Sequence, residues 1–505
     1  MKYFLVATFS AVLAQMAFAA DLTGRWVAEA HTPTGEKRDT VIALKADGGQ
    51  LTGYLETRNR PAAISDGKVN GDEFSFDIVR ESFGEETRTH YTGRVTADGL
   101  ALTMPGFGGR PGRELMAKRV SSEAPAPLPP HPPMISLPPM QDVRYNGMAK
   151  TPPMGWNSWN KFRNKVDDKV VREIADAMVS NGMKAAGYTY VNIDDTWEGT
   201  RDAAGNIRTN EKFPDMKALS AYVHGKGLKL GIYSSPGPKT CAGYEGSFKH
   251  ETQDAKTYAA WGIDYLKYDW CSASEVYDYH SLPTVYAQMG QALLASGRPI
   301  LFSLCEYGRV DVGEWGARSG GNLWRTTGDI SDNWKSMAHI GFELQEGLDK
   351  FSAPGHWNDP DMLEIGNGGM SDEEYRTHMS LWSLLAAPLL AGNDLRSVQP
   401  NILAILTDKE VVAIDQDRLG KQAARVAKDG DLEVWSRPLA DGSHAVGLFN
   451  RGAETAKVTA RWNDLGLKGS HRVRDLWAHA DRGSVADEFS ADVPSHGVVL
   501  VKVAR

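Results

Sequence analysis

This sequence has few cysteines, few long apolar runs and no excess of basic residues. Three cysteines in 505 residues exclude a small fold that depends on many disulfides. After the N-terminus, no stretch reaches the roughly 18 apolar residues that a membrane-spanning helix needs. The net charge of -8 argues against nucleic acid or an anionic membrane as the main partner, and no glycine-rich phosphate loop is present. We therefore expect a neutral or small substrate, with no cofactor, no metal and no membrane partner.

The single apolar run lies at the start of the chain. Residues Met1 to Ala19 contain Lys2, an apolar stretch from Tyr3 to Leu13, and the small residues AFA before Ala20. This is the pattern of a secretory signal peptide cleaved after Ala19. We expect an exported protein, periplasmic or secreted, in which a disulfide can form.

The next hundred residues are expected to form a small domain of antiparallel strands, residues 20–120. Paired strands turn at Asp47-Gly48-Gly49 and at Asp98-Gly99, which predicts a small barrel or sandwich. No catalytic constellation occurs in it, so a structural role is favoured over carbohydrate binding. A linker at 121–146 follows, and the eight prolines between Ser121 and Met140 predict an extended spacer.

Strands and helices alternate through a catalytic domain at 147–419. Eight strands are predicted, at Pro153 to Trp159, Thr189 to Asp195, Lys229 to Ser235, Asp264 to Trp270, Pro299 to Cys305, Leu323 to Thr327, His356 to Asp359 and Leu389 to Leu395. Helical patterns lie between them. Eight such units predict a (β/α)8 barrel, with a doubly wound sheet as the alternative. Short alternating strands at 420–505 predict a C-terminal antiparallel β-sandwich.

The most informative stretch of this domain runs from Trp261 to Cys271 and reads WGIDYLKYDWC. A buried parallel strand here ends in charged residues, Lys267 and Asp269. The carboxyl ends of barrel strands are where catalytic groups are placed. Polar and aromatic residues at or just beyond other strand ends point the same way: Trp156, Trp159, Asp194, Asp195, Tyr233, Glu306, Arg325, Asp329, Asp359 and Asp361.

Carboxylates, two cations and aromatic rings at one mouth suit a neutral polyol, because they bond hydroxyl groups and cover the apolar face of a sugar. Glycoside hydrolysis needs two carboxyl groups around the scissile bond. Lys267 should hold Asp269 ionised, as a nucleophile requires. Asp329, on a loop beyond Arg325, suits a proton donor and acceptor. Spacing alone does not single out this pair among the carboxylates.

Several long segments, in order, resemble the family 27 glycoside hydrolases, whose best-known members are α-galactosidases. The resemblance covers roughly Met148 to Gln422 and is carried by TPPMGWNSWN, VNIDDTWEG, WGIDYLKYDWC, FSLCEYG, NLWRTTGDI, GHWNDPDMLEIGN and LLAAPLLAGNDL. It implies a barrel followed by a β-sandwich. It also implies a retaining double displacement that releases terminal α-D-galactosyl residues from oligosaccharides or polysaccharides.

The resemblance also implies roles for individual residues. Asp269 matches the nucleophile and Asp329 the acid/base. Sugar contacts match Trp159, Asp194, Asp195, Tyr233, Lys267, Glu306 and Arg325. Cys241 and Cys271 match a disulfide, which leaves Cys305 as a free thiol. Glu306 argues for a plain 2-hydroxyl, because relatives that prefer N-acetylgalactosamine have a small residue there.

Four alternatives remain open. Tyr307 stands where many α-galactosidases carry a tryptophan, so a β-L-arabinopyranosidase on the same barrel is possible, as is an α-N-acetylgalactosaminidase. Asp359 and Asp361 after His356 are compatible with a hard metal in a metal-dependent hydrolase, although hydrogen bonds to the loops are the preferred interpretation. A non-catalytic sugar-binding protein is disfavoured, since both catalytic carboxylates are present.

Overall fold

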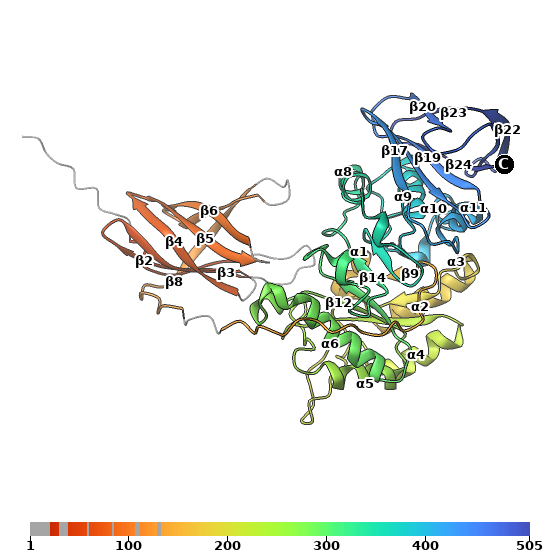
Figure 1. The fold of residues 1–505 in the computed structure, drawn as a ribbon. Coiled ribbons are helices and arrows are strands. Elements are labelled where there is room, and N and C mark those ends of the chain that lie inside the picture. Colours follow the sequence, from red (N-terminus) through yellow and green to blue (C-terminus); the bar gives the residue numbers. More distant parts are fainter. Residues whose placement is uncertain (1–20, 30–38, 58–59, 83–84, 107–111, 129–132) are drawn as a thin grey trace, which may run out of the picture. The chain divides into compact units, whose positions relative to one another are not determined.

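A computed structural model of the chain describes residues 21–29, 39–57, 60–82, 85–106, 112–128 and 133–505. The predicted signal peptide at 1–19 lies outside these residues. The chain divides into two compact units, one up to residue 132 and one from Pro133 to Arg505. In Figure 1 the first runs from red to orange and the second from orange through yellow and green to blue.

The first unit is a closed antiparallel barrel in which each strand pairs with the next and β1 pairs with β8. Its strands are β1 (Gly24–Ala28), β2 (Thr40–Asp47), β3 (Gln50–Thr57), β4 (Arg60–Asn70), β5 (Glu73–Ser82), β6 (Glu85–Thr96), β7 (Gly99–Met104) and β8 (Arg113–Ser121). The turns predicted at Asp47-Gly48-Gly49 and Asp98-Gly99 join β2 to β3 and β6 to β7.

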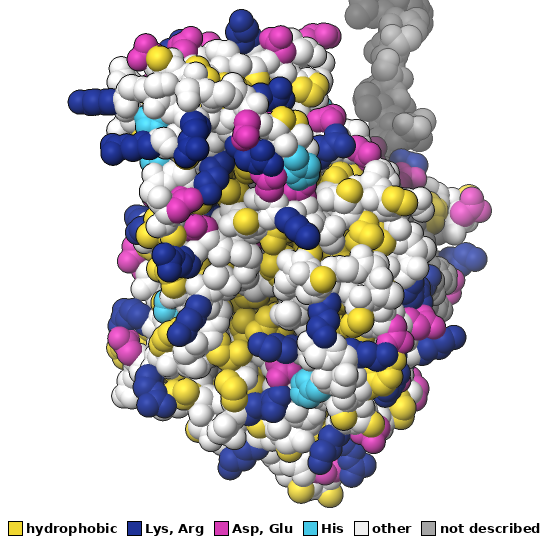
Figure 2. All heavy atoms as spheres, turned by 90° about the vertical axis from the view of Figure 1, so that its right-hand side faces the viewer, with side chains coloured by type: hydrophobic (Ala, Val, Ile, Leu, Met, Phe, Trp, Pro, Cys, Tyr) yellow, Lys and Arg dark blue, Asp and Glu magenta, His cyan; other side chains and the backbone are white. Residues whose placement is uncertain are grey.

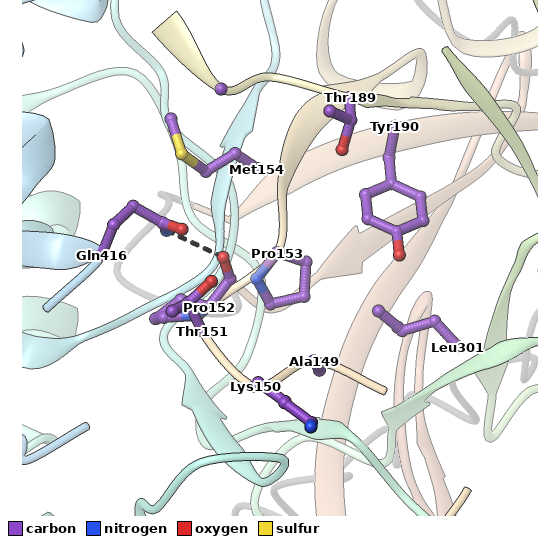
Figure 3. A pocket seen from close by; sticks show the side chains of 11 residues that line it. Ala149, Lys150, Thr151, Pro152, Pro153, Met154, Thr189, Tyr190, Leu301 and Gln416 are labelled. Atoms are coloured by element: carbon purple, nitrogen blue, oxygen red, sulfur yellow. Dashed lines mark hydrogen bonds between the residues drawn. The ribbon is translucent and has the colours of Figure 1, made fainter. Parts of the chain in front are cut away.

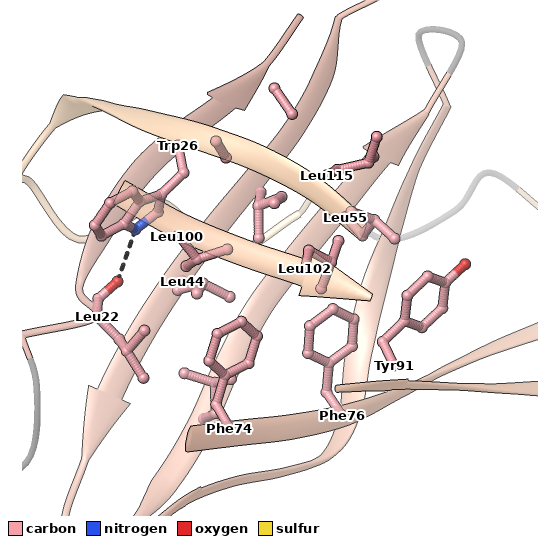
Figure 4. Close-up of a cluster of buried hydrophobic side chains, with 14 of the residues drawn as sticks. Leu22, Trp26, Leu44, Leu55, Phe74, Phe76, Tyr91, Leu100, Leu102 and Leu115 are labelled. Carbon is pink, nitrogen blue, oxygen red and sulfur yellow. Dashed lines mark hydrogen bonds between the residues drawn. The ribbon is translucent and has the colours of Figure 1, made fainter. Parts of the chain in front are cut away.

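Apolar side chains fill the interior of this barrel. Trp26, Leu44, Phe74 and Phe76 belong to one buried cluster, as Figure 4 shows, and the Trp26 indole donates to the carbonyl oxygen of Leu22 at 3.0 Å. A barrel of eight strands is just wide enough to be filled by its own side chains. The described part of this unit therefore has a packed apolar interior, and its structural role stays a prediction.

The second half of the predicted spacer packs against the second unit. Ile135 forms a parallel bridge with Tyr277, and the Leu137 amide donates to the Ser281 hydroxyl at 2.7 Å. The Asn146 side chain donates to Asn322 at 2.9 Å. Residues from 133 to 146 are thus part of the second unit and lie along it, rather than forming a free linker, because their backbone and side chains find hydrogen-bond partners there.

Eight parallel strands form the core of the second unit, as predicted. They are β9 (Met154–Asn157), β10 (Tyr190–Asn192), β11 (Lys229–Ser234), β12 (Tyr265–Asp269), β13 (Leu301–Cys305), β14 (Leu323–Arg325), β15 (Trp357–Asp359) and β16 (Leu389–Ala391). Neighbours in sequence are neighbours in the sheet, and β16 pairs with β9. A parallel bridge from Leu363 to Ala391 joins the chain after β15 to β16, which closes the (β/α)8 barrel and excludes the doubly wound alternative.

Helices lie between these strands and after the last of them. They are α1 (Trp159–Phe162), α2 (Asp168–Ser180), α3 (Met183–Ala186), α4 (Met216–Gly225), α5 (Glu251–Trp261), α6 (Leu282–Ala295), α7 (Val312–Trp315), α8 (Trp334–Ala338), α9 (Asp372–Leu385), α10 (Pro400–Leu406) and α11 (Lys409–Asp415). Side chains cap the longer ones: Asp167 accepts from Val170 N at the start of α2, and Ser371 with Glu374 forms a capping box on α9. Such caps satisfy amides that have no partner inside the helix.

The C-terminal strands form the predicted β-sandwich. Its strands are β17 (Ala424–Asp429), β18 (Leu432–Pro438), β19 (His444–Asn450), β20 (Ala456–Arg461), β21 (Ser470–Asp475), β22 (Ala480–Ala486), β23 (Glu488–Val493) and β24 (Val498–Ala504). Six strands make one sheet, and β20 pairs with β23. The sandwich packs on α9 of the barrel, where buried Arg437 donates to the Ser383 carbonyl at 2.9 Å and Trp477 to the Ser380 hydroxyl at 2.9 Å.

The surface of the second unit carries charges of both signs. On the face in Figure 2, Lys and Arg side chains are scattered among Asp and Glu, so neither sign forms one continuous patch in this view. Among the described residues, no helix combines the length and apolar composition that crossing a bilayer requires.

Candidate active site

The predicted site residues lie at the carboxyl ends of the barrel strands. Because the strands are parallel, these ends meet at one rim. Tyr233 of β11 is paired with Lys267 of β12, and Asp269 with Cys305 of β13. The other members follow the strand ends by one to four residues: Trp159 after β9, Asp194 and Asp195 after β10, Glu306 after β13 and Asp329 after Arg325 of β14.

Asp269 is held by two tyrosines. The Tyr233 hydroxyl donates to Oδ2 at 3.1 Å and the Tyr307 hydroxyl to Oδ1 at 2.5 Å. Burial raises the pKa of Asp269 to about 6, against the opposing effects of Lys267 and the Tyr307 hydrogen bond. The carboxyl group is 6% exposed. The sequence indicated that Lys267 alone would keep it ionised, whereas burial offsets much of that effect. Asp269 is still mostly ionised at pH 7.

The direct partner of Lys267 is Asp194. Lys267 Nζ lies 2.9 Å from Asp194 Oδ2, which also accepts from the Asn157 amide at 2.8 Å. Although burial opposes it, Asp194 holds the pKa of Lys267 well above its usual range. The rim of β9, β10 and β12 therefore carries a fixed ion pair with both donor and acceptor atoms for hydroxyl groups.

Asp195 has one oxygen fixed and one without a partner. Oδ2 accepts from the Ala242 amide at 2.7 Å, while Oδ1 has no hydrogen-bond partner among the described residues. Burial raises the pKa of Asp195 to about 7. Sequence reasoning missed the neighbouring Glu198, which is fully buried and accepts from the Thr196 amide at 3.1 Å. Burial and Asp195 raise the pKa of Glu198 well above its usual range.

Asp329 is the most exposed of the candidate carboxylates, with 72% of its side chain accessible. Its Oδ1 lies 3.2 Å from Arg325 Nη2. Desolvation at the rim works against ionisation, but the cations Arg325 and Lys267 outweigh it and hold the pKa of Asp329 below its usual value. This direction is opposite to what a proton donor needs in the free protein.

Asp359 and Asp361, considered as metal ligands from the sequence, have protein partners. Asp361 Oδ2 lies 2.9 Å from Arg325 Nη2 and accepts from the Ile330 amide at 2.9 Å. Asp359 Oδ1 accepts from the Asp361 amide at 2.9 Å. These contacts correspond to the preferred interpretation, in which both carboxylates order the loops of the rim.

Glu306 shapes the loop after β13. Its Oε2 accepts from the amides of Gly308 and Arg309 at 2.9 and 3.0 Å, and its Oε1 has no partner among the described residues. Burial raises the pKa of Glu306 well above its usual range. The sequence indicated a sugar contact here, and the structure adds a second task, which is to hold the turn that carries Tyr307.

The two tryptophans near the end of β9 differ. Trp156 is fully buried and its indole donates to the Asn393 carbonyl at 2.8 Å, so it belongs to the barrel core. Trp159 is half-buried at the start of α1. Its stacking role stays a prediction.

A disulfide joins Cys241, after β11, to Cys271, after β12. It lies next to the site, because Cys271 Sγ is 3.3 Å from the Tyr233 hydroxyl. Cys305 is free and buried. Among the described residues, Cys241, Cys271 and Asp269 also come close enough to hold a metal ion, but the disulfide occupies both sulfur atoms.

A separate cavity of about 250 Å³ lies at the opposite end of the barrel strands. Figure 3 shows its walls, which include Pro153 and Met154 before and at the start of β9, Tyr190 of β10 and Leu301 of β13. Gln416 donates to the Pro152 carbonyl at 2.9 Å across it. Catalytic groups of this fold lie at the other rim, so this cavity is structural.

Comparisons with known protein families agree with the barrel and the residues at its rim. The family model described as "Alpha galactosidase A" matches residues 151–417. The chain belongs to this family. A second family model, the "Alpha galactosidase C-terminal beta sandwich domain", matches residues 429–503, which is the region of β18 to β24.

The α-galactosidase family includes close relatives of this chain. An α-galactosidase of Cyamopsis tetragonoloba is 52% identical over 357 residues, which are 70% of this chain and 85% of that protein. The crystal structure of α-galactosidase I from Mortierella vinacea has 38% identity and a TM-score of 0.68, over 71% of this chain and 98% of that one. The structure of the Saccharomyces cerevisiae α-galactosidase has 27% identity and a TM-score of 0.66, over 71% and 98%. The protein is a glycoside hydrolase of this family.

Proposed function

We propose that the protein removes terminal α-D-galactosyl residues from oligosaccharides or polysaccharides with retention of anomeric configuration. The observation that carries this proposal is the pair of unlike carboxylates at one rim. Asp269 is buried, held by two phenols and mostly ionised at neutral pH, whereas Asp329 is exposed on a loop beside Arg325. A retaining glycosidase needs one fixed nucleophile and one proton-transferring carboxyl group.

The first step forms a bond between an Asp269 oxygen and the anomeric carbon. The bond from that carbon to the aglycone oxygen breaks, and Asp329 gives its proton to the departing oxygen. In the second step water attacks the anomeric carbon and its proton returns to Asp329. The ester bond to Asp269 breaks, so both carboxyl groups end as they began.

Asp329 must be protonated before the first step although Arg325 favours its ionised form. A bound sugar displaces water from this exposed carboxylate and so weakens the solvation of its charge. The negative charge of Asp269 also favours a proton on Asp329. When Asp269 becomes an ester that charge disappears, so the pKa of Asp329 falls and its ionised form is available as the base for the second step.

The sugar would bind at the polar atoms that the barrel leaves available. The Lys267–Asp194 pair supplies a donor and acceptors, and the free Oδ1 of Asp195 supplies another acceptor. Glu306 Oε1 has no hydrogen-bond partner among the described residues, and a glutamate stands where relatives that prefer N-acetylgalactosamine have a small residue, so we propose galactose in preference to N-acetylgalactosamine. The half-buried ring of Trp159 suits the apolar face of the sugar.

Hydrolysis of nitrophenyl glycosides by the mature protein tests this proposal. The panel contains the α-galactoside, the α-N-acetylgalactosaminide and the β-L-arabinopyranoside, which is the same sugar without its hydroxymethyl group. Asp269→Ala serves as the blank. We expect the α-galactoside to react fastest. If the β-L-arabinopyranoside reacts fastest, the proposed mechanism stands but the preference for galactose is wrong. If no glycoside of the panel reacts, the proposed function is wrong.

We also propose that the protein is exported. The basic residue, apolar run and AFA sequence before Ala20 support this, and a Cys241–Cys271 disulfide requires an oxidising compartment. Expression with the native leader, followed by N-terminal sequencing of the protein outside the cytoplasm, tests the proposal. Ala20 at the N-terminus is expected, and protein that stays in the cytoplasm with Met1 would contradict it.

A further inference from the structure

We propose that Tyr307 is a positioning residue for the attack on the anomeric carbon: together with Tyr233 it fixes the Asp269 carboxylate and keeps it ionised. This proposal rests on the role of Asp269 as nucleophile. It gives Tyr307 a part in the chemistry, whereas the sequence indicated only that this position differs from the tryptophan of many α-galactosidases.

The geometry places one phenol on each carboxylate oxygen. Tyr307 reaches Oδ1 from the loop after β13, and Tyr233 reaches Oδ2 from β11, so the two donors approach from the strands on either side of β12. The Tyr307 contact, at 2.5 Å, is the shorter. Short phenol–carboxylate contacts are charge-assisted and about twice as strong as bonds between neutral groups. The plane of the carboxylate is therefore fixed from both sides.

An unusual backbone conformation brings Tyr307 into this position. Its φ is +65°, which is rare for a bulky aromatic residue and costs on the order of 1–3 kcal/mol. Gly308 follows with φ +80°, and a Cβ there would lie 2.3 Å from the Thr326 carbonyl oxygen. Glu306 holds this turn through two amides. The loop thus keeps a strained residue whose hydroxyl bonds to Asp269.

The surroundings of Tyr307 keep its hydroxyl protonated, so that it can donate a hydrogen bond. Burial raises the pKa of its hydroxyl well above the usual range, and the nearby Asp269 charge adds to this effect. The phenol therefore does not lose its proton near neutral pH. Its hydrogen bond lowers the pKa of Asp269, while burial raises it.

Other charged or titratable groups also face Asp269. They are Lys267 on its own strand, Asp194 after β10, Tyr233 on β11, Cys305 at the end of β13 and Asp329 after β14. Removal of the Tyr307 hydroxyl alone leaves all of these in place. A change in the titration of Asp269 in such a variant can then be assigned to one hydrogen bond.

The hydrogen bond helps both chemical steps. In the free protein it keeps Asp269 charged and aimed at the anomeric carbon. In the second step the carboxylate is the leaving group: its bond to carbon breaks as water attacks, and the negative charge returns to the oxygens. A phenol placed on one of these oxygens stabilises the returning charge.

Tyr307→Phe tests the proposal, because it removes the hydroxyl and keeps the ring. The matched control is Tyr286→Phe, whose hydroxyl is also buried nearby but donates to the Tyr268 carbonyl at 3.1 Å. The measurement is kcat/KM for nitrophenyl α-galactoside between pH 4 and 8, whose acid limb reports the ionisation of the nucleophile in the free enzyme.

We expect Tyr307→Phe to lower kcat/KM by about tenfold to a hundredfold and to move the acid limb, near pH 6 in the parent protein, to higher pH. Tyr286→Phe should leave the limb unchanged. A parent-like limb in Tyr307→Phe, with or without a loss of rate, would overturn the proposal. If that variant does not fold, Tyr307→Trp also lacks the hydroxyl and is judged by the same limb. A parent protein inactive on the whole panel would instead reject the proposed function.

Discussion

Arg325 and Asp361 form a buried ion pair at the rim of the barrel, with Nη2 and Oδ2 2.9 Å apart and both side chains 5% exposed or less. The same Asp361 oxygen accepts the amide of Ile330, the neighbour of Asp329. A single carboxylate therefore neutralises Arg325 and anchors the loop that carries the proposed acid/base. Asp361 has φ +87°, a conformation that Asn tolerates better than Ala.

Asp361→Asn should remove the charge without adding backbone strain. Leaving Arg325 buried with only the exposed Asp329 and nearby Asp359 as carboxylate neighbours should cost about 3 kcal/mol of unfolding free energy. The value of kcat should also fall, because the Asp329 loop is less well held. Urea unfolding and steady-state kinetics measure the two effects. Asp441→Asn, which breaks the exposed pair with Lys502 at 2.7 Å, is the control and should cost less than about 1 kcal/mol. Equal losses in the two variants would contradict the role given to Asp361.

Asp329→Ala should slow substrates with poor leaving groups far more than nitrophenyl galactosides, because only the former need a proton in the first step. Azide can then replace water in the second step. Since the galactosyl ester at Asp269 still forms, the product should be α-galactosyl azide. Asp269→Ala should give the β-anomer, because azide then attacks directly. Product analysis by NMR decides, and the same anomer from both variants would reject the assignment of the pair.

Much of this arrangement could be predicted from the sequence. The eight parallel strands are short buried runs whose ends carry polar residues, and helices lie between them as predicted. What the sequence did not show is where side chains point just beyond a strand. Thr196, Tyr307 and Asp361 follow β10, β13 and β15, and each has a positive φ.

Such turns reverse the alternation of side chains that a strand imposes, and local preferences do not predict positive φ in these residue types. The contact between Tyr307 and Asp269 was therefore not predicted, and Glu198, two residues after Thr196, was missed. The ion pair of Lys267 with Asp194 was also not predicted, because it joins β12 to the end of β10 across β11. It depends on the closed barrel rather than on spacing along the chain.

Reduction of the Cys241–Cys271 disulfide should destabilise the second unit. The bond closes a loop with a sequence separation of 30, worth about 3.5 kcal/mol in the chain-entropy model. Cys241→Ser should lower the unfolding free energy by a similar amount, and a reducing agent should have no further effect on that variant. In the parent protein, thiol titration should find one reactive group, Cys305, only after denaturation. Three thiols in native protein would contradict the bond.

His378 should make the protein less stable in acid. The ring is fully buried on α9, stacks near Trp382 with ring centroids 4.1 Å apart, and accepts from the Glu364 amide at 3.4 Å. Burial lowers its pKa from 6.5 to about 3. Between these values the unfolded chain binds one more proton than the folded chain does, so stability falls as pH falls. The slope is about 1.4 kcal/mol per pH unit, or roughly 5 kcal/mol over the window.

His378→Gln removes this proton while keeping an acceptor for the Glu364 amide. Urea unfolding at pH 7, 5.5 and 4 should therefore show the variant less stable than the parent at pH 7 and the difference shrinking as the pH falls. His479→Gln is a control of opposite sign. The Glu410 hydrogen bond raises the pKa of His479, so its stabilisation is present at low pH and is lost as the pH rises past that raised pKa. If the parent and His378→Gln curves run parallel, His378 is not neutral in the folded protein and the burial argument fails.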